Sequence, residues 1–130
     1  MATDYTFGKT VKEPFDSAVT KVTAALAKEG FGVLTEIDVA ATLRKKLGTE
    51  MRPYRILGAC NPPLAHRAIE AEPQIGALLP CNVVVREDAA GRTQVEIMDP
   101  QSVMQLVGRP EIAALAAQVR AKLERVLADV

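Results

Sequence analysis

The sequence has no tryptophan and only five other aromatic side chains, two from tyrosine and three from phenylalanine, in 130 residues. Its sixteen lysine and arginine residues balance its sixteen aspartate and glutamate residues, so the formal net charge is zero. Such a chain lacks both the basic field that gathers phosphate backbones and the aromatic side chains on which bases stack. We therefore expect no nucleic-acid partner.

Long apolar runs are also absent. No apolar stretch approaches the roughly 18 residues that span a bilayer, and the N-terminal segment MATDYTFGK lacks the basic start and apolar stretch of a secretory signal. We expect a cytoplasmic protein with no membrane partner. Because 130 residues can bury a full core, the two cysteines, Cys60 and Cys81, need not form a disulfide, and reduced thiols are expected in that compartment.

Recognisable catalytic motifs are missing as well. The sequence has no phosphate loop, dinucleotide glycine fingerprint, nucleophile elbow or zinc-protease helix. Its acidic residues show no pairing that would mark a general acid and base. The sequence therefore predicts no hydrolase chemistry and no cofactor, and it leaves open whether the protein is an enzyme.

Apolar periodicity and turn residues divide the chain into alternating strands and helices. The expected strands are 4–11, 31–37, 54–60, 81–87 and 92–98. The expected helices are 15–29, 39–47, 62–71, a short piece at 74–79, a short helix from Pro100 to near Gly108, and a C-terminal helix over 110–129. No linker interrupts this order, so residues 1–130 are predicted to form a single α+β domain with the five strands in one sheet.

A run of three valines, 83–85, predicts that the strand 81–87 is central and covered on both faces.

The stretch around Cys60 is the most informative for chemistry. Gly58 precedes it, and Asn61 is expected to cap the helix that follows, whose unpaired backbone N–H groups and dipole would favour an anion. Cys81 begins the next strand. If the two strands are antiparallel neighbours, both thiols lie at one edge of the sheet. If a right-handed crossover makes the strands parallel, the thiols lie at opposite ends and share no site.

Three interpretations of the thiols stay open at this point. They are buried and act as small apolar side chains, they carry redox or covalent chemistry, or they bind a metal together with His66, the single histidine. The spacing of the three residues matches no zinc signature, so we expect no metal site. Five basic residues within 44–55 could bind a small anion, but most of them suit a helix C-terminus on an ordinary solvated surface.

Three motifs resemble a known family. The segments 30–38, 54–62 and 79–82, the last two carrying the cysteines, are similar to the bacterial and archaeal family catalogued as domain of unknown function 302. The resemblance runs from about Thr10 to Met98. It implies a fold like that of the TATA-binding protein, a curved and mainly antiparallel sheet with helices against one face, and a homodimer. It implies no activity, cofactor or catalytic residue.

Our leading hypothesis is a small binding or accessory domain that holds a small ligand near Gly58, Cys60, Asn61, Cys81 and Asn82. The second hypothesis is a thiol-redox enzyme or sensor, with Cys60 as the reactive thiol and Cys81 as its resolving partner. The third is a homodimer that serves protein interaction without ligand chemistry.

Overall fold

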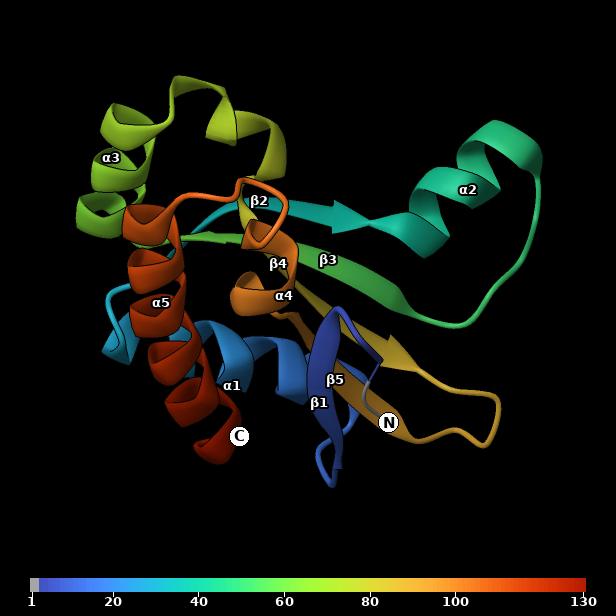
Figure 1. Cartoon of the computed structure of the whole chain (residues 1–130). Helices are drawn as coiled ribbons and strands as arrows, with labels where there is room; N and C mark the ends of the chain where they lie inside the picture. Colours follow the sequence, from blue (N-terminus) through green and yellow to red (C-terminus); the bar gives the residue numbers. More distant parts are fainter. Residues whose placement is uncertain (1–2) are drawn as a thin grey trace.

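The computed structural model describes residues 3–130, which form one five-stranded sheet and six helical segments (Figure 1). The strands are β1 (Thr6–Val11), β2 (Gly32–Asp38), β3 (Tyr54–Cys60), β4 (Cys81–Glu87) and β5 (Thr93–Met98). The helices are α1 (Phe15–Lys28), α2 (Val39–Leu47), α3 (Pro62–Ala71), the 3₁₀ segment η1 (Pro73–Leu78), α4 (Pro100–Met104) and α5 (Pro110–Ala128). The predicted α+β class with one sheet is confirmed.

The strand order is β1-β5-β4-β3-β2, and every neighbouring pair is antiparallel. The strand and helix boundaries follow local signals in the sequence. Asp38 begins α2 by accepting a hydrogen bond from the Ala41 N–H at 2.9 Å, and Gly48 ends it with a φ of 68°. Asn61 caps α3, and prolines occupy the start of that helix, where a missing N–H costs nothing.

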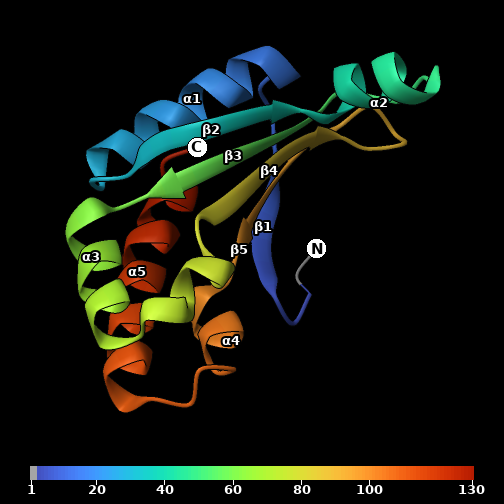
Figure 2. The same ribbon diagram turned by 90° about the horizontal axis from the view of Figure 1, so that it is seen from above.

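The main core lies between the sheet, α1 and the C-terminal half of α5. α1 runs across one face of the sheet, as Figure 2 shows. Its apolar stripe meets the inward side chains of the three central strands, among them Leu57 of β3, Val83 of β4 and Val95 of β5, none of which is exposed. Leu123 and Val126 of α5 close this core from the side.

A second, smaller core lies beyond the end of the sheet. It is built by α3, η1, α4 and the N-terminal half of α5, which gather at the same end of the molecule (Figure 1). Leu64, Ile75, Met104 and Ile112 are buried in it. Val119 of α5 contacts both cores, so the C-terminal helix joins the two halves of the molecule.

The prediction that both faces of β4 would be covered is wrong. Val83 and Val85 face the main core, but on the opposite face Asn82 is exposed and Val84 is half-exposed. The reason is topological, because the helical segments that connect β3 to β4 continue past the end of the sheet instead of crossing back over its second face.

The structure differs from the prediction at the end of α4. α4 ends at Met104, before the predicted end near Gly108, and a turn carries the chain on to α5.

Within residues 3–130, no helix has the length and apolar character needed to cross a bilayer.

Arg120 of α5 ties three elements together. Its guanidinium donates to Asp99, the residue that caps α4, and to Glu124 at 2.7 Å. The same group lies 3.8 Å from the centre of the Phe7 ring in β1. Because the Arg120 side chain is only 24% exposed, these contacts are partly shielded from water and hold α5 against the edge of the fold.

We expect Arg120→Ala to lower the free energy of unfolding by about 1 to 2 kcal/mol, because it removes the contacts with Asp99 and Phe7 together. Denaturant unfolding followed by circular dichroism measures the change. Gln118→Ala, an exposed position on the same helix, is the matched control and should shift stability by less than about 0.5 kcal/mol. Equal effects of the two substitutions would contradict the role of Arg120.

Candidate functional site

Cys60 and Cys81 lie at the same end of the sheet. β3 ends at Cys60, β4 begins at Cys81, and the two strands are antiparallel neighbours in which Ala59 lies opposite Cys81. Of the two topologies left open by the sequence, the structure has the one that brings the cysteines close together.

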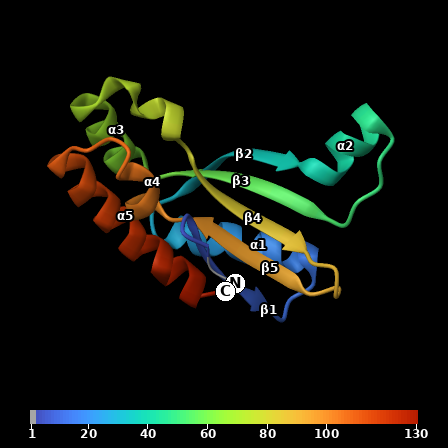
Figure 3. The same ribbon diagram turned by 45° about the vertical axis from the view of Figure 1, so that its right-hand side comes forward.

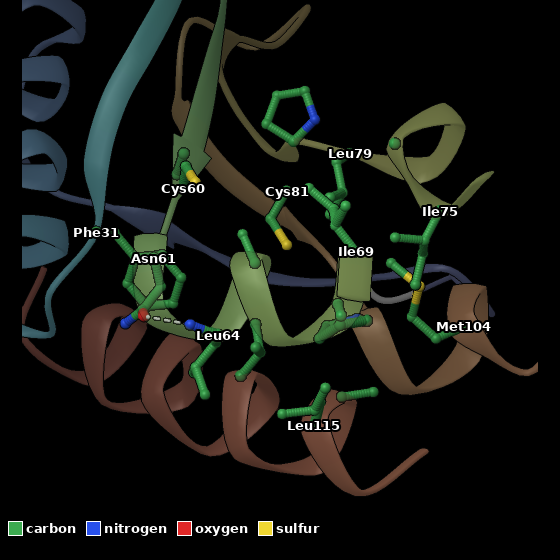
Figure 4. A pocket seen from close by; sticks show the side chains of 18 of the residues that line it. Phe31, Cys60, Asn61, Leu64, Ile69, Ile75, Leu79, Cys81, Met104 and Leu115 are labelled. Carbon is green, nitrogen blue, oxygen red and sulfur yellow. Dashed lines mark hydrogen bonds between the residues drawn. The ribbon is translucent and has the colours of Figure 1, made fainter. Parts of the chain in front are cut away.

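The pleat of the sheet nevertheless points the two thiols in different directions. Residues directly opposite each other on paired strands share a face, so Cys81 shares the face of Ala59. Cys60, the next residue along β3, belongs to the other face. Figure 4 shows both sulfur atoms beside one pocket, and both cysteines are free.

This pocket is a cavity of about 340 Å³ between the end of the sheet and the second core. Its walls come from the ends of β3 and β4 and from α3, η1, α4 and α5 (Figure 4). Most of the lining is aliphatic, with Leu64, Ile75, Met104 and Leu115 among its members. Of residues 3–130, no charged side chain lines it. The cavity can therefore hold an apolar molecule but offers no ion pair to a charged one.

Cys81 is the more deeply buried thiol, with 7% of its surface exposed. Burial, and to a smaller extent the neighbouring Cys60, raises the pKa of Cys81 from 9.0 to about 11. At neutral pH this thiol is protonated and carries about a hundredfold less thiolate than an ordinary cysteine. Cys60 is half-buried and remains the more accessible of the two.

Residues 62–65, the first turn of α3, offer Cys60 no free backbone donor. Pro62 and Pro63 have no N–H, the Leu64 N–H donates to the Asn61 side chain at 3.3 Å, and the Ala65 N–H donates to the Asn61 carbonyl at 2.9 Å. The expectation that unpaired N–H groups would favour an anion beside Cys60 is therefore wrong. The same prolines that predicted this helix also remove the donors that such a site needs.

Of the other three predicted site residues, Asn61 lines the cavity, whereas Gly58 and Asn82 do not. Asn61 lines the cavity, but its amide group is already engaged, since it caps α3 and its Nδ2 donates to the Glu29 carbonyl at 3.4 Å. Gly58 allows close packing, because a Cβ there would lie 2.3 Å from the Thr35 hydroxyl. Asn82 lies opposite Gly58 on the exposed face of the sheet and does not line the cavity.

His66 and the basic segment, which the sequence offered as metal and anion ligands, lie outside the cavity. The His66 side chain is 74% exposed and lies 3.5 Å from Glu70, one turn along the same helix. Among residues 3–130, no group of three metal-ligating side chains comes together. In the basic segment, Arg52 pairs with Glu87, and Arg55 pairs with Glu36 at 2.9 Å.

Sequence reasoning missed the aliphatic walls of the cavity. The sequence predicted α3 only as a helix, with no role for Leu64 or Ala68, and the apolar stripe of α5 was expected to join one continuous core. The available signal was the length of that α5 stripe, which extends past the sheet and must be covered by something else. Leu34 and Ile69, both exposed at 67% and 43%, were also missed, and they line the cavity from its outer side.

Comparison with known proteins gives one family. The model of the family described as domain of unknown function DUF302 matches residues 7–130, which includes α5 and so extends beyond the predicted span of 10–98. A crystal structure described as that of the uncharacterized conserved protein DUF302 from Bacillus stearothermophilus is similar, with a TM-score of 0.89 and 27% sequence identity. The similarity covers 96% of this chain and 97% of that one. No curated protein matches.

The raised pKa of Cys81 predicts a pH dependence of stability. Folding favours the neutral thiol, so its contribution is complete below about pH 9 and is lost as the pH rises through 11. We expect Cys81→Ala to remove about 2 kcal/mol of the fall in unfolding free energy between pH 8 and pH 11. Urea unfolding at each pH measures it.

Cys60→Ala is the control for this prediction. It should keep most of the pH dependence, because burial and not the neighbouring thiol is the larger cause of the raised pKa of Cys81. A Cys81→Ala protein whose stability follows the wild-type pH profile would show that Cys81 is not buried as described.

Proposed function

The chain belongs to the family described as domain of unknown function DUF302, which names no ligand, and we propose that it is a binding domain for a small apolar molecule held in the cavity beside Cys60 and Cys81. The observation that carries the proposal is a cavity of about 340 Å³ whose lining includes no charged side chain. Its size lies within the usual range of ligand pockets.

The size of the cavity indicates how large a ligand it can hold. An engineered apolar cavity of about 150 Å³ in another protein stays dry and binds benzene. A cavity of about 340 Å³ therefore has room for a molecule clearly larger than a single aromatic ring.

The chemistry of the lining restricts the buried part of the ligand to neutral groups. Asn61 uses its amide oxygen to cap α3 and its amide nitrogen to bind the Glu29 carbonyl, so the side chain with the strongest polar groups in the lining is already engaged by the protein. The remaining polar side chains there are the two thiols, which are weak hydrogen-bond donors. Burying a charge in such surroundings without a partner is very costly.

Two exposed side chains at the outer side of the cavity suggest that the ligand is elongated. Leu34 and Ile69 line the cavity while 67% and 43% of their surfaces stay exposed. Leu34 lies at the irregularity in the pairing of β2 with β3, which falls between Val33 and Thr35. These side chains continue the apolar surface outward, which fits an alkyl chain with its tail in the cavity and its polar head in water.

We expect the uncharged dye N-phenyl-1-naphthylamine to bind, and straight-chain alcohols to displace it. Each added methylene should tighten binding about fourfold, which corresponds to about 0.8 kcal/mol, until the chain fills the cavity. Because no charged side chain lines the cavity, alcohols and alkyl carboxylates of equal chain length should bind within about tenfold of each other. Fluorescence titration measures these affinities.

The matched variants for this test place the same bulk inside and outside the cavity. Ala65→Phe fills the cavity from α3 and should abolish displaceable dye binding, whereas Ala114→Phe, on the exposed side of α5, should leave it unchanged. Dye binding that is equal in the two variants, or that does not depend on chain length, would refute the proposed function.

The thiol-redox hypothesis has less support. The pleat directs Cys60 and Cys81 to different faces of the sheet, and the pKa of Cys81 is raised, which leaves little thiolate to resolve an oxidised Cys60. Residues 62–65, the first turn of α3, have no free N–H group with which to activate Cys60.

A specific observation favours a second function, self-association into a homodimer through the β2–α2 region. α2 stands away from the rest of the chain (Figures 1 and 3) and contains no buried residue. β2 is an edge strand, so one row of its backbone groups has no partner strand in the monomer. Ile37, Leu47 and Met51 are exposed in this region, as expected of a surface that another copy covers.

We expect sedimentation velocity to show a dimer and Leu47→Glu to shift it toward monomer by at least tenfold in dissociation constant, because a charge would enter an apolar contact. Leu106→Glu is the matched control, since Leu106 is 81% exposed in the turn after α4. A monomeric wild-type protein, or equal effects of the two substitutions, would exclude this interface.

A further inference from the structure

Two thiols line the cavity and differ in accessibility. Cys60 is half-buried, whereas Cys81 is 7% exposed. In the described part of the chain neither sulfur belongs to a disulfide, and the pKa of Cys81 is set by burial and by Cys60 with no hydrogen bond contributing. The cavity therefore holds an unpartnered buried thiol and, beside it, a more accessible one, in a lining that is otherwise almost entirely aliphatic (Figure 4).

We propose that Cys60 is a covalent capture site for apolar α,β-unsaturated ketones that enter the cavity. This inference rests on the proposed function, because the cavity must first bind the alkyl part of the molecule. Among the lining residues that the structure describes, the thiols are the strongest nucleophiles, and unsaturated carbonyl compounds are soft electrophiles that react with thiolates.

The reaction is a conjugate addition. The Cys60 thiolate attacks the carbon at the far end of the double bond, and one carbon–sulfur bond forms. The electron pair of the double bond moves toward the carbonyl, and the proton lost from the thiol reaches the carbon next to the carbonyl through water. No group leaves, and no oxidant or reductant is needed.

Cys60 reacts and Cys81 does not, for two reasons. The thiolate is the reactive form, and burial raises the pKa of Cys81 to about 11. Cys81 is also shielded from the water that must carry the proton, because only 7% of its surface is exposed.

The expected increase in the rate of addition comes from binding the electrophile beside Cys60 and not from an activated thiol. Residues 62–65, the first turn of α3, have no free N–H group to stabilise a thiolate or an enolate. Binding the alkyl chain beside Cys60 raises the local concentration of the reactive carbon. The rate should therefore saturate with the concentration of an apolar ketone and stay linear for a hydrophilic reagent.

The experiment uses oct-1-en-3-one as the apolar electrophile, acrylamide as the hydrophilic one and octan-3-one as the unreactive analogue. Intact-mass spectrometry gives the rates, peptide mapping locates the adduct, and N-acetylcysteine supplies the reference rate for each reagent. We expect the preference of Cys60 for octenone over acrylamide to exceed that of N-acetylcysteine at least tenfold. Octan-3-one should slow the octenone reaction and leave the acrylamide reaction unchanged.

Variants separate the site from the cavity. Cys60→Ser should lose the adduct, and Cys81→Ser should keep it with saturating kinetics. Ala65→Phe should keep Cys60 but lose saturation, because the cavity is filled, while Ala114→Phe should behave as wild type. Circular dichroism of each variant checks the fold, and the two substitutions that retain Cys60 and Cys81 carry the test if a cysteine variant fails to fold.

The outcomes distinguish this inference from the proposed function. Octan-3-one that displaces the dye while octenone reacts linearly, or an adduct on Cys81, overturns covalent capture and leaves apolar binding intact. Octan-3-one that fails to displace the dye, together with linear kinetics, overturns both.

Discussion

Antiparallel pairing of β3 with β4 is the constraint on which the rest of the structure depends. Because Ala59 lies opposite Cys81, the chain that leaves β3 must enter β4 at the same end of the sheet. Residues 61–80, which form α3 and η1, start and finish at this end and lie beyond the strands without crossing a face of the sheet. Their apolar sides need another partner, and the N-terminal half of α5 supplies it together with α4. The second core and the cavity between the two cores both follow from this one pairing.

The polar groups near the cavity are used to hold the fold together. Asn61 caps α3 and also binds the end of α1 through the Glu29 carbonyl, so it links two helices across the corner of the sheet. Gly58 lets Thr35 and Pro80 approach the backbone of β3. Because these groups are satisfied by the protein itself, the interior of the cavity is left to aliphatic side chains and two thiols, which favours apolar binding over ion or redox chemistry.

Much of the fold could be predicted because its signals are local. β3 and α3 have the predicted bounds, since Asn61 and the prolines after it mark both the end of one element and the start of the next. The candidate site could be predicted only in part. Cys60, Asn61 and Cys81 line the cavity, whereas Gly58 and Asn82 belong to the strands beside it. The predicted coverage of β4 was wrong because it depends on where a neighbouring segment goes. The predicted unpaired N–H groups at α3 were wrong because Pro62 and Pro63 have none to offer.

The sequence by itself determined the order of the strands and helices, most of their limits, their apolar stripes, the helix caps and the family. These properties depend on residues within a few positions of one another, where spacing and backbone preferences are strong enough to decide. Only the tertiary structure decided that the thiols meet at one edge, that one face of the sheet stays open, and that a cavity without charge lies between two cores. Those features arise from strand pairing and from contacts between distant segments, whose free energy does not reside in any single stretch of the chain.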